Sequence, residues 1–123
     1  TRFRNVTGVQ TCALPISVPP GCDCYLLKSV LHDWDDDACI GILRAVHAGM
    51  HAGSQVFVIE RLLPALASED PEAVWLDLRM MAVTGGRERT LTQYQSIIER
   101  AGLRVHDASR AVTGFRVIEA VKR

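Results

Sequence analysis

The sequence lacks the features that would place it in several large classes of protein. Its 14 Lys and Arg residues balance 14 Asp and Glu residues, so no excess positive charge points to nucleic acid or to an anionic membrane surface. No apolar run approaches the roughly 18 residues of a membrane-spanning helix. Four cysteines occur without a Cys-x-x-Cys pair, and the spacing of Cys22 and Cys24 is too weak a pattern to predict a zinc site. We therefore expect a cytoplasmic protein with reduced thiols.

The composition is that of one globular domain. The chain has 123 residues, of which 48% are hydrophobic and 23% are charged. Apolar residues run together over 24–31 and 55–60, which predicts two buried strands. Between them, residues 35–50 carry apolar side chains at helical spacing. This strand–helix–strand order predicts two parallel neighbours in an open α/β sheet.

The second half of the chain predicts two helices and a closing strand pair. A helix over 72–82 would turn a set of apolar side chains inward, namely Val74, Trp75, Leu78, Met81 and Ala82. Thr90 and Gln93 have capping-box spacing at the start of a shorter helix, and Gly102 is a natural C-cap. Strands over 103–108 and 115–121 are joined by only about six residues, so they should pair antiparallel.

Three side chains form the best candidate for a chemical site. His32 follows the first strand and Glu60 ends the second, so both should lie at the edge of the sheet where ligands bind in α/β folds. Glu88 lies in a loop that follows Gly85 and Gly86, which can adopt backbone angles closed to other residues. A carboxylate bonded to one imidazole nitrogen leaves the other free to act as a base. The alternatives are a structural histidine and a surface Glu88 paired with a neighbouring arginine.

The acidic run after His32 has two interpretations. Asp33, Asp35, Asp36 and Asp37 can cap a helix and complement its dipole. They can also form a divalent-metal site with His32, as in a metal-dependent hydrolase, although such a site needs further ligands. The remaining histidines supply none convincingly. Trp34, next to this run, is either a core residue or a ring that stacks on a flat ligand.

Residues 1–16 differ from the rest of the chain because they show no clear hydrophobic period. They resemble the translation of an adapter oligonucleotide used in DNA sequencing libraries. We therefore predict that 1–16 are a non-native extension with few contacts to the domain over 17–123; the alternative is a natural N-terminal arm.

Three motifs resemble the S-adenosylmethionine-dependent O-methyltransferases of the plant caffeic-acid and bacterial natural-product type. The first covers residues 27–34, Leu-Lys-Ser-Val-Leu-His-Asp-Trp. The second is Val58-Ile59-Glu60 before Leu63-Pro64, and the third is Gly-Gly-Arg-Glu-Arg-Thr over 85–90. The resemblance covers 17–123 and implies the C-terminal half of a Rossmann-like class I methyltransferase sheet, ending in an antiparallel strand pair.

The resemblance also implies roles for individual residues. His32 matches the catalytic base of the family, and Glu60 and Glu88 match the acids beside it. Lys28 and Trp34 match positions that contact S-adenosyl-L-methionine, while Asp33 and Met80 fall on the acceptor side. No metal is expected in such a mechanism.

The implied function is methyl transfer from S-adenosyl-L-methionine to a hydroxyl group of a small, aromatic acceptor. The glycine-rich cofactor loop and the ribose-binding acid of the family are absent from the sequence. The resemblance therefore implies a piece that is inactive alone, taken from an enzyme that forms homodimers through an N-terminal domain. The alternatives are a metal-dependent hydrolase that uses His32 and Asp33, and a non-catalytic α/β module.

Overall fold

A computed structural model describes residues 18–64, 66, 68–83 and 86–123, and the prediction for residues 1–16 lies outside them. The elements are β1 (Cys24–Lys28), the short 3-10 helix η1 (Leu31–Asp33), α1 (Asp36–Gly49), β2 (Gln55–Glu60), α2 (Pro71–Val83), α3 (Leu91–Arg100), β3 (Leu103–Asp107), β4 (Ala111–Val112) and β5 (Phe115–Lys122). The predicted helices and strands are therefore present, with differences in length and burial.

The strands form one mixed sheet in the order β1-β2-β5-β3, with β4 paired to β5. β1 and β2 are parallel, as the strand–helix–strand pattern predicts. β5 is antiparallel to β3, which confirms the predicted closing pair. β5 also inserts between β2 and β3 and runs antiparallel to β2. The parallel pair places the ends of β1 and β2 at the same edge of the sheet.

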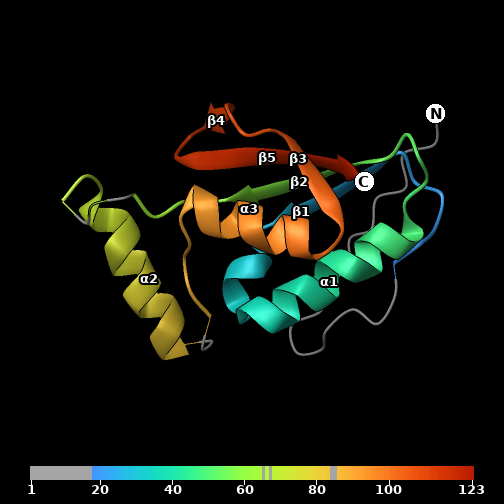
Figure 1. Ribbon diagram of the computed structural model, residues 1–123. Coiled ribbons are helices and arrows are strands. Elements are labelled where there is room, and N and C mark those ends of the chain that lie inside the picture. Colours follow the sequence, from blue (N-terminus) through green and yellow to red (C-terminus); the bar gives the residue numbers. More distant parts are fainter. Residues whose placement is uncertain (1–17, 65, 67, 84–85) are drawn as a thin grey trace.

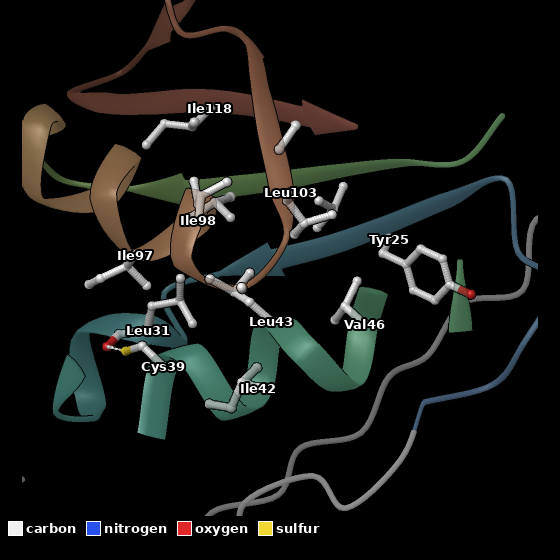
Figure 2. Packing of buried hydrophobic residues seen from close by; sticks show 14 of the residues in the cluster. Tyr25, Leu31, Cys39, Ile42, Leu43, Val46, Ile97, Ile98, Leu103 and Ile118 are labelled. Carbon is white, nitrogen blue, oxygen red and sulfur yellow. Dashed lines mark hydrogen bonds between the residues drawn. The ribbon is translucent and has the colours of Figure 1, made fainter. Parts of the chain in front are cut away.

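The core lies between the sheet and the two helices α1 and α3, which share one face of the sheet (Figure 1). Figure 2 shows Leu43 and Val46 of α1 packing toward Ile98 of α3 and Ile118 of β5. Each of these side chains is at most 1% exposed. Burying an aliphatic side chain of this size stabilises a fold by about 1.5–3 kcal/mol. This core therefore fixes the position of the sheet, and with it the ends of β1 and β2.

β1 departs from the prediction of a strand buried over 24–31. It ends at Lys28, because Ser29 has a left-handed φ of 54° and the chain then turns into η1. Leu26 is 66% exposed, since β1 is the outer strand of the described sheet and α1 and α3 cover only the opposite face. A continuous apolar run predicted burial on both faces, and that prediction is wrong for β1.

The helix ends follow the predicted local signals. Asp35 caps α1 by accepting a 2.8 Å hydrogen bond from the Ala38 N–H. Thr90 and Gln93 form a reciprocal capping box at the start of α3. Gly102, with a φ of 87°, follows the last residue of α3 and its C-cap. These contacts depend on near neighbours in the chain, which explains why spacing alone predicted them.

The predicted inward face of α2 is wrong. Trp75, Leu78 and Met81 are 65%, 48% and 59% exposed, and Ala82 is exposed as well. Figure 1 shows α2 standing apart from the sheet, whereas α1 and α3 lie against it. Helical periodicity identifies an apolar face but does not say what covers it. The described part of the chain thus leaves about half or more of Trp75, Leu78 and Met81 uncovered, whereas Val74 of the predicted inward set is half-buried.

The cysteines and the helices bear on two of the expectations from composition. Cys22, Cys24 and Cys39 are free in the described part of the chain, and the reduced state of the thiols stays a prediction. Within the described ranges, no helix is long and apolar enough to cross a membrane. The cytoplasmic location stays a prediction.

Candidate active site

The turn that carries His32 is held by the end of the neighbouring strand. Glu60, the last residue of β2, accepts hydrogen bonds from the backbone N–H groups of Val30 at 3.0 Å and Leu31 at 2.9 Å through Oε1. These N–H groups start η1, where no earlier carbonyl of the turn can accept them. A buried carboxylate thus fixes the backbone just before His32.

His32, Glu60 and Glu88 converge, as their positions at one sheet edge predict. The Nδ1 atom of His32 lies 3.1 Å from Oε1 of Glu88 and 3.9 Å from Oε2 of Glu60. Glu60 is fully buried and Glu88 is 4% exposed, whereas 19% of the His32 side chain is exposed. Only the Glu88 distance is that of a hydrogen bond. Glu88 therefore contacts the ring directly, and Glu60 acts mainly on the backbone of the turn.

This geometry determines which ring nitrogen carries a proton. A carboxylate accepts hydrogen bonds, so we assign the Nδ1–H of His32 as the donor to Glu88, and this assignment puts the lone pair of neutral imidazole on Nε2. The Glu88 hydrogen bond raises the pKa of His32, burial opposes it, and the nearby charges of Glu60, Glu88 and Asp33 raise it further. The imidazole is thus a stronger base than a free histidine.

Glu60 is an unusual carboxyl group. Burial raises its pKa to about 7, against the lowering effects of His32 and of the Leu31 N–H. Its Oε2 atom and Oε2 of Glu88 are buried and have no hydrogen-bond partner among the residues that the structure describes. One ligand atom from each of His32, Glu60 and Glu88 lies within 4.8 Å of the others, a donor set that could hold a metal ion.

The acidic run is mostly used in structural contacts. Asp35 caps α1, and Asp36 pairs with Arg87 at 2.7 Å and with Arg89 at 2.9 Å. Both arginines thus pair with Asp36, so the alternative of a surface Glu88 paired with one of them is wrong. Asp33 is the member of the run that approaches His32, with Oδ1 at 3.5 Å from Nε2.

The other predicted site residues lie at different depths. Lys28 is exposed at the end of β1, with Nζ 5.2 Å from the centre of the Phe115 ring, so it is not the buried lysine that the sequence suggested. Trp34 is half-buried and packs against the core, directly after η1. Met80 belongs to α2, and its side chain lies outside the described residues. The cofactor and acceptor roles of these residues stay predictions.

The parts that three residues play in building the site were not predicted from the sequence. Arg89 is fully buried and bonds to the backbone around His32, and Asp77 of α2 accepts a 2.7 Å hydrogen bond from the Glu88 N–H. Gly86 packs so closely on the turn that an added Cβ would collide with the His32 carbonyl oxygen. This glycine is required by close approach rather than by its backbone angles. The one feature of the sequence that could have pointed to these residues is the position of Arg89, next to Glu88 in a loop that begins with two glycines.

Comparison with known proteins identifies the family. Residues 7–104 match the profile of the O-methyltransferase domain, and the chain belongs to this family. The match begins inside 1–16, and the non-native origin of that segment stays a prediction. The mitomycin biosynthesis 6-O-methyltransferase of Streptomyces lavendulae is 37% identical over 106 residues, which cover 84% of this chain and 29% of that protein. The chain thus spans about a third or less of the curated relatives that it matches first.

Solved structures agree with this assignment. LaPhzM matches 88% of this chain and 32% of its own length, with a TM-score of 0.82 and 32% identity. The O-methyltransferase NcsB1 from neocarzinostatin biosynthesis, solved with S-adenosylmethionine and 2-hydroxy-5-methyl naphthoic acid, matches 87% of this chain and 30% of its own length, with a TM-score of 0.75 and 33% identity. The predicted class I methyltransferase fold and family are therefore confirmed.

Proposed function

We propose that this chain is the C-terminal, base-carrying part of an enzyme that transfers a methyl group from S-adenosyl-L-methionine to a hydroxyl group of a small aromatic acceptor. The observation that supports this most is the hydrogen bond between Nδ1 of His32 and Glu88 in a chain of the O-methyltransferase family. It leaves Nε2 as a base on a partly exposed ring at the end of the sheet.

His32 would remove the proton from the acceptor. Nε2 takes the hydroxyl proton while the Nδ1–H keeps donating its hydrogen bond to Glu88, whose carboxylate stabilises the imidazolium that forms. S-adenosyl-L-methionine, when bound, supplies an electrophilic methyl group on its sulfonium. General-base help of this kind accelerates a reaction by about 10²–10⁴-fold, or roughly 3–5 kcal/mol. Glu60 would keep the turn in place through the Val30 and Leu31 N–H groups.

Lys28 and Trp34 are the proposed contacts to the cofactor. The exposed ammonium of Lys28 lies at the end of β1, where it can approach a carboxylate or a hydroxyl group. Trp34 follows η1 and offers a flat face next to the same strand end. Both positions fit a ligand at this edge of the sheet.

The acceptor would lie on the Nε2 side of His32, near Asp33, with Met80 as a further contact that the family resemblance implies. NcsB1 is bound to a hydroxynaphthoic acid, which supports a flat phenolic acceptor for this chain. We further propose that the intact enzyme is a homodimer through an N-terminal domain, as the family resemblance implies.

The experiment is a methyl-transfer assay with radiolabelled S-adenosyl-L-methionine and a panel of hydroxynaphthoic acids. An intact relative carrying the same His, Glu and Glu should label the hydroxyl oxygen. The 123-residue chain alone should show no transfer and no tight cofactor binding by calorimetry, because it has no glycine-rich cofactor loop. Micromolar cofactor binding by the chain alone would contradict this second expectation.

A metal-dependent hydrolase is the second candidate, and one observation favours it: the donor atoms of His32, Glu60 and Glu88 lie close enough to share an ion. The cluster differs from the predicted pair of His32 and Asp33. Removal of metals by a chelator separates the two functions. Methyl transfer by an intact relative should be unchanged, whereas loss of activity that Zn²⁺ or Mn²⁺ restores would favour the hydrolase.

A further inference from the structure

Arg89 has the largest side chain among the fully buried residues that the structure describes. Its guanidinium donates to the carbonyl oxygens of Leu31 at 3.0 Å, Trp34 at 2.7 Å and Arg87 at 3.4 Å, and to Oδ1 of Asp36 at 2.9 Å. A buried charge destabilises a fold by several kcal/mol unless it is paired and hydrogen-bonded. Four acceptors around one guanidinium indicate that the backbone of the turn and Asp36 are arranged to bind this side chain.

Two of these acceptors bracket His32. Leu31 begins η1 and Trp34 is its C-cap, so the carbonyls that accept from Arg89 lie on either side of His32 and Asp33. Inside the turn, the backbone hydrogen bonds are two 3.2 Å contacts, from Asp33 and Trp34 back to Val30 and Leu31. The planar guanidinium therefore fixes both ends of a turn whose own hydrogen bonds are long.

Arg89 is also the chain neighbour of Glu88. Its carbonyl oxygen accepts a 2.8 Å hydrogen bond from the Leu63 N–H, and its backbone forms a bridge with Leu62. One short segment thus delivers Glu88 to the imidazole of His32 and Arg89 to the backbone of the same turn. The distance between His32 and Glu88 depends on both contacts.

We propose that Arg89 is a positioning residue for His32: it sets the geometry of the His32–Glu88 pair by holding the backbone of the turn, without contact with the reacting atoms. The inference rests on the proposed function for its kinetic consequence. A lysine at this position keeps the charge but cannot span acceptors on both ends of the turn, because its ammonium is a point donor.

The first test is an NMR titration of His32 in this chain, as wild type and as Arg89→Lys and Arg89→Met. The charged groups that face the ring are Glu60 from β2, Glu88 from the segment before α3, and Asp33 from the turn, and both variants keep all three. If Arg89 positions the pair, the pKa of His32 falls toward about 6.5 in both variants, because the Glu88 hydrogen bond weakens.

A purely electrostatic role gives the opposite sign. Loss of a nearby positive charge favours the imidazolium, so Arg89→Met would raise the pKa of His32 and Arg89→Lys would leave it unchanged. That result would overturn the proposal. Arg87→Met is the matched control: it removes the other arginine paired with Asp36, but Arg87 makes no side-chain bond to a carbonyl of the turn, and the pKa of His32 should not fall.

Thermal unfolding reports whether each variant folds. If Arg89→Lys does not fold, Asp36→Glu replaces it, because it keeps the negative charge but moves the carboxylate that anchors the guanidinium, while Arg89 stays in place. A fall in the pKa of His32 that is smaller than the fall expected for the Arg89 variants supports the proposal. An unchanged pKa of His32 overturns it.

The second test is kinetic, in an intact relative with matching residues. Arg89→Lys should lower kcat on the order of 10–100-fold, leave the cofactor Kd unchanged, and move the acidic limb of the pH–rate profile to lower pH. A fall in the pKa of His32 without any loss of methyl transfer would support positioning and contradict the base role of His32. A loss of transfer with an unchanged pKa would contradict positioning.

Discussion

Replacing Glu60 by glutamine should remove a loss of folding stability that the wild type suffers as the pH rises. The glutamine oxygen can still accept from the Val30 and Leu31 N–H groups, so the turn keeps its anchor. What changes is the acid itself, since burial raises the pKa of Glu60 from 4.5 to about 7. The wild type must ionise this carboxyl group in a buried place as the pH rises, and the variant does not.

The sign and size follow from proton linkage. Because the folded-state pKa of Glu60 is raised, its contribution to stability is fully present below about pH 4.5 and is lost as the pH rises through about 7. At about 1.4 kcal/mol per pH unit, the loss amounts to about 3 kcal/mol. The difference in the free energy of unfolding between Glu60→Gln and wild type should therefore shift by about 3 kcal/mol in favour of the variant between pH 4 and pH 8.

Urea denaturation followed by circular dichroism at several pH values measures this difference. Glu99→Gln, at an exposed position on α3, is the control for replacing a carboxylate that is not buried. If the curves for wild type and Glu60→Gln run parallel, the pKa of Glu60 is not raised, and the reasoning from burial is wrong.

Three further results are expected. Gly86→Ala should destabilise the chain by about 1–3 kcal/mol because the new Cβ collides with the His32 carbonyl, whereas Gly41→Ala, in open space on α1, should be neutral or stabilising in the same thermal melts. Thr90→Ala removes the capping box and should lower the free energy of unfolding by about 1 kcal/mol and Tm by about 4 °C. In an intact relative, the methyl-transfer rate should rise with pH through the raised pKa of His32, because only neutral imidazole takes a proton; a rate that falls over that range would contradict the base role.

The features that depend on near neighbours could be predicted from the sequence. The ends of α1 and α3 depend on Asp35, Thr90 and Gln93, which act within one turn of the helix. The convergence of His32 and Glu60 also follows, because parallel neighbouring strands end at one edge of the sheet. Spacing and topology were sufficient in these cases.

The features that depend on which distant segment covers a surface or inserts into the sheet could not be predicted. The exposed face of Trp75 on α2 and the exposed edge of β1 depend on what packs against them, which apolar periodicity does not encode. The place of β5 between β2 and β3 is a long-range pairing. The burial of Arg89 was not predicted, because it depends on the carbonyls of Leu31 and Trp34, which come from a distant part of the chain.

The central claim is that His32, held by Glu88, is the base of a methyl transfer. The most direct measurement is the single-turnover rate of methyl transfer in an intact relative, for wild type and for His32→Gln at the matching position, with the cofactor Kd of each measured by calorimetry. The account predicts a rate lower by about 10²–10⁴-fold and a Kd that changes by less than about twofold, because the base acts on the acceptor and not on the cofactor. A rate within a few fold of wild type, or a loss of rate explained by weaker cofactor binding, would contradict the claim.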